Sequence, residues 1–238
     1  MRSAVAATLL ALAYASAAFS HETDEAFAEK IRTYILANPE IILEAMDVLA
    51  SREAEAEVAS LLATSATEIL NPDRAIVLGD PAAPHRIFEL FDYRCASCKA
   101  GHPVLEAFVA ENPDVAVMVQ QLPILGPQSD RAARAYLAVF ELGGAEAAAR
   151  LHAVLFDLAA PLSTSVLESV LSELGHNPEA VEDAMYAAEI TARINANKDA
   201  ALALGAIGTP VFVTERRVHQ GVATMEVLEE MLADLRAN

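Results

Sequence analysis

The sequence predicts an α/β domain that is interrupted by an all-helical insertion and preceded by an N-terminal helical arm. Three observations support this prediction. Strand-like segments flank a helical segment within residues 75–122, residues 124–205 show only helical patterns, and residues 23–67 form a separate helical stretch. Strands that alternate with helices are typical of an α/β fold with a parallel sheet. The long helical run before the last strands therefore indicates an insertion.

Composition excludes several classes of function. Of the 238 residues, 54% are apolar and 21% are charged, so the chain can bury a core and is not intrinsically disordered. The 16 Lys and Arg against 34 Asp and Glu give a net charge of −18. This acidity argues against nucleic acid as a partner, because phosphate binding requires basic patches. With 2 cysteines, a disulfide-rich scaffold is excluded.

Residues 1–18 are predicted to be a secretory signal peptide. One Arg precedes an apolar run, and Ala15-Ser16-Ala17 has the A-x-A spacing of a cleavage site. A membrane anchor is the alternative, but the run is shorter than the roughly 20 residues that a spanning helix needs. We therefore expect a soluble mature protein in an oxidising compartment.

Residues 19–72 are predicted to form the helical arm. Asn38-Pro39 combines a helix cap with a proline suited to the first helical turn, so a second helix should start there. The arm is too short to bury its own apolar stripe, which should pack on the main domain or on another subunit. Both alternatives remain open, and the second would give a homo-oligomer that forms through residues 22–67. The stripe consists of Phe27, Ile31, Tyr34, Ile35, Ile42, Met46, Leu49, Val58, Leu61 and Leu62.

Residues 73–238 are predicted to form the α/β domain. Its first elements are strands at 75–78 and 86–93, a helix at 96–111 and a strand at 115–122. The strand–helix–strand order is typical of a parallel crossover unit. The insertion is placed at about 124–188 within the helical residues, and strands at 211–214 and 217–219 with a helix at about 223–236 follow.

Cap signals predict where the helices of the insertion begin and end. Ser165 and Glu168 have the spacing of a capping box, and Gly175 follows the apolar stripe of that helix. Asn177-Pro178 then starts the next helix.

The chemistry of the chain is concentrated at Cys95 and Cys98, which follow an apolar strand and begin a helix. A C-x-x-C pair near a strand–helix unit is typical of a redox site. At a helix N-terminus, unpaired N–H groups and the helix dipole favour a thiolate on Cys95. Cys98 lies one turn further into the helix. We therefore expect Cys95 to be the exposed, attacking sulfur and Cys98 the shielded, resolving one.

Other interpretations of the pair remain open. A structural disulfide would close a loop of about four residues, which stabilises a protein by only roughly 2 kcal/mol. Haem attachment requires a histidine where Lys99 stands. Cys95, Cys98 and His102 share a helical face that could bind metal, but a structural zinc site normally has four ligands. We therefore predict no metal site, although adventitious binding of soft ions such as Cu(I) is expected.

These residues resemble a known family. The segments FELFDYRCASCKAGHP and LGAIGTPVFV are similar to DsbA-like periplasmic thiol–disulfide oxidoreductases of the thioredoxin superfamily, over about residues 75–238. ANPEIILEAM in the arm resembles the suppressor of copper sensitivity protein C branch, some members of which oligomerise through the arm and act as isomerases. The resemblance implies a thioredoxin fold, no cofactor and a periplasmic location.

The resemblance also assigns roles to single residues. It implies that Cys95 is the nucleophile, that Cys98 resolves the mixed disulfide, and that Pro103 kinks the active-site helix. Thr209-Pro210 matches the cis-proline loop beside the disulfide. There a substrate segment could pair with the backbone as an extra strand.

Glu89 occupies the position at which the family carries an acidic residue beneath the cysteines. Its neighbours in sequence are apolar, so burial should raise the pKa of Glu89. A carboxyl at this position could exchange a proton with Cys98. The alternative is a structural ion pair between Glu89 and an arginine of the insertion.

The sequence departs from the family pattern between the cysteines. Ala96-Ser97 stands where strongly oxidising members have a histidine, so the disulfide should be less oxidising than theirs. Arg94 and Lys99 could restore part of the positive field, although a solvated position is expected for Lys99. His102 is expected at the surface or in a groove.

The leading hypothesis is an enzyme that donates disulfides to proteins or reshuffles wrong ones. Its expected partners are unfolded or misoxidised secreted proteins and a membrane redox protein, either a reductase or a quinone-linked oxidase. The rival hypothesis is a copper(I)-binding or metal-handling protein on the same fold.

Overall fold

The computed structural model of the chain describes residues 25–65, 71–73, 75–158 and 161–237. The predicted signal peptide lies outside the described residues. Backbone contacts divide the chain into two compact units, with the boundary between Ala54 and Glu55. None of the described helices is long and apolar enough to cross a membrane.

Two helices form the N-terminal arm, as the sequence predicts. The first covers residues 25–37, and the second is α2 (Glu40–Ser65). They are separated at Asn38, whose conformation is restricted because proline follows it. Large apolar side chains along both helices are exposed, while the side chains of Val58, Leu61 and Leu62 lie outside the described residues. The exposed ones are Phe27, Ile31, Tyr34, Leu36, Ile42, Leu43, Met46, Val48 and Leu49.

A mixed sheet of five strands lies at the centre of the larger unit, in the order β1-β3-β2-β4-β5. β2 and β3 are parallel and all other neighbours are antiparallel, so the predicted crossover unit is confirmed. Every residue of β3 is buried, as its continuous apolar start predicts. The strands are β1 (Ile76–Gly79), β2 (His85–Phe91), β3 (Val115–Gln121), β4 (Val211–Val213) and β5 (Val218–Gln220).

Helices cover both faces of this sheet. α3 (Ala96–Glu111) and α8 (Met225–Arg236) share one apolar core with Ile87 and Phe91 of β2. The opposite face packs against Ala200, Ala201 and Leu204 near the end of α7. Side chains alternate between the two faces along a strand. Glu89 therefore points to the face that α3 covers.

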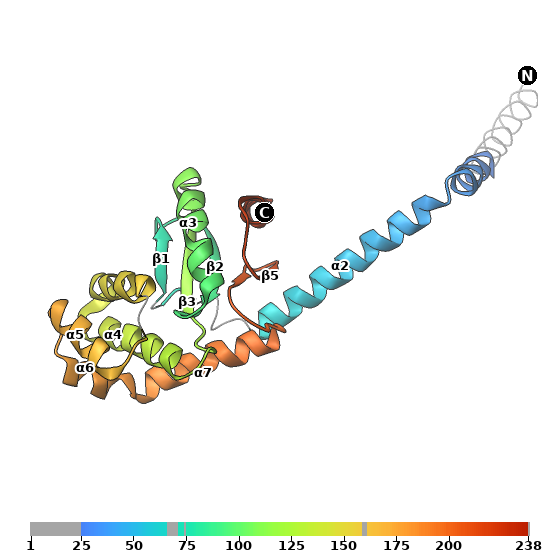
Figure 1. Cartoon of the computed structure of the whole chain (residues 1–238). Coiled ribbons are helices and arrows are strands. Elements are labelled where there is room, and N and C mark those ends of the chain that lie inside the picture. The colour runs from blue at the N-terminus through green and yellow to red at the C-terminus, as the bar shows by residue number, and fades with distance from the viewer. Residues whose placement is uncertain (1–24, 66–70, 74, 159–160, 238) are drawn as a thin grey trace, which may run out of the picture. The chain divides into compact units, whose positions relative to one another are not determined.

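The described residues between β3 and β4 are predominantly helical, which agrees with the predicted insertion. These helices lie below the sheet and to its left in the view of Figure 1. α4 is interrupted at Gly144, whose φ of 77° breaks the regular helix. The helices are α4 (Pro127–Asp157), α5 (Thr164–Glu173), α6 (Pro178–Met185) and α7 (Ala188–Ala203).

The helix caps of the insertion agree with the sequence at two places and differ at a third. Asn177 caps α6 through its side chain, and Gly175 follows α5 with a φ of 81°. The predicted capping box at Ser165 is wrong. The Ser163 hydroxyl accepts the Val166 N–H instead, so α5 starts earlier. Several adjacent hydroxyl residues can cap this helix, and packing decides among them.

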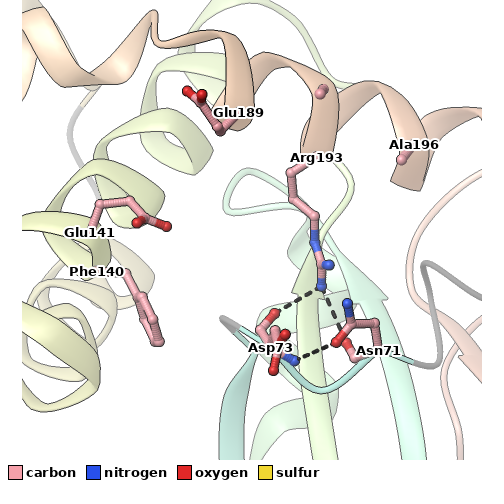
Figure 2. A pocket seen from close by; sticks show the side chains of 8 residues that line it. Asn71, Asp73, Phe140, Glu141, Glu189, Arg193 and Ala196 are labelled. Carbon is pink, nitrogen blue, oxygen red and sulfur yellow. Dashed lines mark hydrogen bonds between the residues drawn. The ribbon is translucent and has the colours of Figure 1, made fainter.

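Arg193 connects α7 to the segment before β1 (Figure 2). Its Nη2 donates to the carbonyl oxygens of Asn71 at 3.2 Å and Asp73 at 2.9 Å, and to Gln120 Oε1 at 2.8 Å. A buried guanidinium requires such partners, and Arg193 is buried. A cavity of about 590 Å³ lies beside this contact, with Glu141 in its wall. α7 thus holds the segment before β1 in place.

Candidate active site

The two cysteines occupy the first turn of α3. Cys95 is the N-cap residue, and the Cys98 N–H donates to Cys95 Sγ at 3.2 Å. Both are free thiols, 6% and 2% exposed respectively. Cys95 is the more exposed of the two, but the expectation that its sulfur is exposed is wrong, because both cysteines are buried. The hydrogen bond from the helix N-terminus nevertheless stabilises negative charge on Cys95 and not on Cys98.

The cis-proline loop lies directly against Cys95. The Thr209–Pro210 peptide bond is cis, as the resemblance predicts. Cys95 Sγ donates to the Thr209 carbonyl oxygen at 3.2 Å. The Thr209 hydroxyl is buried and has no hydrogen-bond partner within the described part of the chain. A substrate bonded to Cys95 would therefore meet the backbone and side chain of Thr209.

Glu89 interacts with Cys98. Burial in β2 raises the pKa of Glu89 to about 8. Burial also raises the pKa of the Cys98 thiol well above its usual value, and the nearby Glu89 charge adds to this effect. Burial is the sole cause of the Glu89 shift, so an ion pair with an arginine is not what sets its pKa. Glu89 thus lies where the sequence predicts, close enough to Cys98 for their charges to interact.

Asp92 holds the loop before the cysteines in place. Its carboxylate accepts three backbone N–H bonds, from Arg94 at 2.8 Å, Ile124 at 2.9 Å and Leu125 at 3.0 Å. Its carbonyl accepts the Cys95 N–H at 3.0 Å. Asp92 therefore fixes Cys95 relative to the loop between β3 and α4. Sequence reasoning missed this role, although a charged residue at the end of an apolar strand was the available signal.

His152 of α4 joins the insertion to the active-site loop. His152 Nδ1 and the Tyr93 hydroxyl are 3.1 Å apart in a buried hydrogen bond. The rings of Phe91, Phe156 and His102 pack around this pair. Burial lowers the pKa of His152 to about 4 and raises the pKa of Tyr93. No local sequence pattern indicates this contact, because His152 and Tyr93 are 59 positions apart in the chain.

Lys99 and His102 lie near the cysteines, and the structure shows the contacts of each. Lys99 is not a solvated side chain, because its Nζ donates to the Leu158 carbonyl at 3.2 Å and lies 5.9 Å from the Phe156 ring centre. His102 is partly buried. Its ring is 4.7 Å from that of Phe156, and its Nε2 is 3.5 Å from Glu106.

Within the described residues, no group of three or more His, Cys, Asp or Glu side chains could hold a metal ion. Cys95, Cys98 and His102 are accordingly not such a group. What the arrangement offers chemically is a sulfur beside a helix N-terminus, a second thiol within reach and a buried carboxyl. The two thiols are the groups that thiol–disulfide exchange requires, and the carboxyl is a group that can exchange a proton.

Comparison with known families agrees with this chemistry. Residues 86–233 match the DSBA-like thioredoxin domain. The chain belongs to this family. Its fold is accordingly a DsbA-like thioredoxin fold, and the protein is a thiol–disulfide oxidoreductase. Residues 25–56 of the arm match the N-terminal domain of the copper resistance protein ScsC. The predicted fold class and family are thus confirmed.

Solved structures give the same result. A thioredoxin-like oxidoreductase from Silicibacter pomeroyi is 31% identical, with a TM-score of 0.64 over 72% of this chain and 97% of its own. A linker-deletion mutant of Proteus mirabilis ScsC is 25% identical, with a TM-score of 0.65 over 87% and 92%. The thiol-disulfide exchange protein alpha-DsbA2 from Wolbachia pipientis, at 20% identity, shares the fold with a TM-score of 0.67 over 77% and 98%. No curated protein sequence matches.

Proposed function

We propose that the protein is a periplasmic disulfide isomerase that acts on misoxidised secreted proteins. The observation that carries the exchange chemistry is the position of Cys95 Sγ, between the Cys98 N–H and the Thr209 carbonyl at 3.2 Å from each. Cys95 acts as the nucleophile, Cys98 resolves, and Thr209 with Pro210 contacts the substrate backbone. The proposed location follows from the predicted signal peptide.

The exchange starts when the Cys95 thiolate attacks a substrate disulfide. This step forms a disulfide between Cys95 and the substrate and releases one substrate thiolate. In isomerisation, another substrate thiolate attacks this mixed disulfide and returns Cys95 as a thiolate, so no electrons are gained or lost overall. If that step stalls, the Cys98 thiolate attacks Cys95 Sγ and releases a reduced substrate. A membrane reductase must then reduce the Cys95–Cys98 disulfide.

Glu89 supplies the proton acceptor for the resolving step. The Cys98 thiol must lose its proton before it can attack, and burial raises its pKa. Because the pKa of Glu89 is about 8, its carboxyl group can take up and release a proton near neutral pH. We therefore assign proton exchange with Cys98 to Glu89.

The arm supports isomerase over oxidase activity. Its large apolar side chains are exposed along residues 25–49, and water-exposed apolar surface of this extent usually marks an interface. A second copy of the chain presents an identical stripe, so the arms can cover one another in a homo-oligomer. Such an assembly places several Cys95 sites around one substrate, which favours repeated exchange on the same molecule.

The alternative function is copper(I) binding by the two thiolates. The arm's match to a copper resistance protein favours it. It predicts stoichiometric Cu(I) binding that requires both cysteines, and no refolding of scrambled ribonuclease. Since the described residues provide no third ligand among His, Cys, Asp and Glu, we consider exchange the main function.

Scrambled ribonuclease refolding and insulin reduction test the proposal directly. The wild-type protein should catalyse both, Cys95→Ser should catalyse neither, and Cys98→Ser should accumulate a mixed disulfide through Cys95. Equal rates for wild type and Cys95→Ser would refute exchange. Rapid alkylation in intact cells then tests the direction. Free thiols would support an isomerase, whereas a Cys95–Cys98 disulfide would show that the protein is an oxidase.

A further inference from the structure

A cavity of about 220 Å³ opens directly beside the reactive cysteine. Both sequence neighbours of Cys95, Arg94 and Ala96, line it. Its other walls come from α3, from α4 and from the segment that follows α4. No residue of the cis-proline loop is among the described residues that line it. The cavity is therefore distinct from the place where the Thr209 backbone meets Cys95.

The inner wall of the cavity is apolar. Ala132 and Leu155 of α4 and Leu162 after it are buried apolar residues of this wall. Tyr93 also lines it, but its hydroxyl is engaged by His152 at 3.1 Å. This wall can therefore hold an aliphatic stem and offers little to a polar group.

The rim of the cavity consists of hydrogen-bond donors. Lys99 Nζ donates to the Leu158 carbonyl, and an ammonium has further N–H donors. Arg94 Nη1 donates to Gln128 Oε1, and its guanidinium likewise has others. Gln128 Oε1 also accepts the Leu162 N–H at 3.2 Å, so its acceptor is occupied and its NH₂ group remains to donate.

The charge of this cavity is opposite to that of the protein. The chain has a net charge of −18, yet Arg94 and Lys99 line the cavity and no Asp or Glu lines it among the residues that the structure describes. Two cations and an amide donor above an apolar wall fit a carboxylate carried on a short aliphatic stem. Aspartate and glutamate side chains have this chemistry.

We propose that this cavity is a substrate subsite that binds an acidic side chain close in sequence to the reacting cysteine of the substrate. The inference rests on the proposed exchange function and adds a sequence preference to it. With Cys95 joined to a substrate sulfur, the Thr209 side holds the substrate backbone. The cavity, which begins at the residues on either side of Cys95, then receives a neighbouring side chain. Arg94 and Lys99 are its specificity-determining residues.

Three matched peptide disulfides test the subsite. They differ only in having Glu, Gln or Lys within two residues of the cysteine. For the wild-type protein, kcat/KM should be about three- to five-fold higher for the Glu than for the Gln peptide, the size expected for partly exposed charge pairs. The Lys peptide should be the slowest. High salt should reduce these differences.

Arg94→Gln and Lys99→Gln should each reduce the ratio of Glu to Gln rates, and the double variant should bring it near one. The ratio is the informative quantity, because a change in the reactivity of Cys95 would affect all three peptides alike. Arg150→Gln is the matched control, since it removes the same charge from an exposed position on α4 outside the cavity. The control should keep the wild-type ratio.

A second measurement covers the case in which a Lys99 variant does not fold. In a Cys98→Ser background, the equilibrium constant for the mixed disulfide is compared between Glu and Gln peptides with Arg94 present or replaced. Equal rates for the three peptides, or a Glu preference that Arg94→Gln leaves undiminished, would overturn the subsite and leave the exchange function intact. Failure to exchange with any peptide would overturn both.

Discussion

Glu89 shows how one buried residue links protein stability to pH. Burial disfavours the charged form and raises the pKa of this carboxyl from its ordinary value of 4.5 to about 8 in the folded protein. Between these values the folded protein holds a proton that the unfolded chain has lost. Rising pH therefore costs stability across this window, by ~1.4 kcal/mol per pH unit. Below about pH 4.5 the carboxyl is protonated in both states and the penalty is absent.

We therefore predict that Glu89→Gln makes the free energy of unfolding less dependent on pH between about 5 and 8. The amide cannot ionise, so the variant should gain most over wild type at the upper end of the window. Urea unfolding of the reduced protein at several pH values measures this. Glu111→Gln, at an exposed carboxyl at the far end of α3, should keep the wild-type slope. Parallel curves for wild type and Glu89→Gln would contradict the prediction.

The same substitution should slow the resolving step. Without a carboxylate to accept the Cys98 proton, attack on the mixed disulfide should slow by on the order of 10²-fold, a typical effect for a general base. Formation of the mixed disulfide by Cys95 should change little. Acid-quenched reactions with a peptide disulfide would show this as accumulated mixed disulfide. An unchanged resolving rate at neutral pH would assign Glu89 a purely structural role.

At the scale of elements, His152 connects α4 to the loop that carries Tyr93. The pKa of His152 falls from 6.5 to about 4 because burial disfavours the charged ring. Above pH 6.5 His152 is neutral in both states, and its contribution to the free energy of unfolding is fully present. As pH falls from 6.5 toward 4, the unfolded chain binds a proton that the folded protein excludes, so this contribution is lost. The stability of the contact between α4 and the loop that carries Tyr93 therefore decreases in acid because of this histidine.

We predict that His152→Asn destabilises the protein at pH 7 but makes its unfolding free energy less sensitive to acid between pH 6.5 and 4. The expected loss of slope is ~1.4 kcal/mol per pH unit, with a baseline loss of about 1–3 kcal/mol from the altered buried pair. Urea unfolding at pH 7, 6, 5 and 4.5 measures both. His85→Asn, at a partly exposed histidine on β2, is the control. If the free energy of unfolding of His152→Asn depends on pH as strongly as that of wild type, His152 is not the source of the acid sensitivity.

Asp92 connects the loop before Cys95 to the loop between β3 and α4. In Asp92→Ala, the part-buried N–H groups of Ile124 and Leu125 lose their acceptor, which should cost about 1–2 kcal/mol. Asp92→Asn keeps one oxygen and should cost less. Asp80→Asn is a matched control, because its carboxylate accepts one exposed N–H. Denaturant titration measures the loss in free energy of unfolding for each variant. If Asp92→Ala loses no more than the control, Asp92 does not hold the two loops together.

Local sequence patterns predicted the elements well, and long-range contacts account for what they missed. The strands around α3, the break at Asn38 and the cap at Asn177 each depend on residues a few positions apart. The contact of Lys99 with Leu158 and that of Tyr93 with His152 each join residues 59 positions apart. No local rule indicates such pairs. The insertion therefore supplied the features of the site that sequence reasoning did not foresee.

At the scale of the whole molecule, the chain combines a buried catalytic centre with an arm that exposes apolar side chains. The two parts make separable contributions under the proposed function. Reduction of an exposed disulfide requires only Cys95 and Cys98. Isomerisation of a misoxidised substrate benefits from several active sites that the arms hold together. Variants of the arm should therefore affect the two activities differently.

We predict that Ile31→Glu in the arm lowers the solution mass to that of a monomer, because a charge in the apolar stripe opposes its burial between copies. Isomerase activity should fall several-fold, and insulin reduction should stay within about two-fold per active site. Arg32→Glu places the same charge at the adjacent exposed position and should preserve the assembly. Deletion of residues 21–70 should repeat the Ile31→Glu result. If light scattering gives the same mass for the deletion and for wild type, the arm does not assemble the protein.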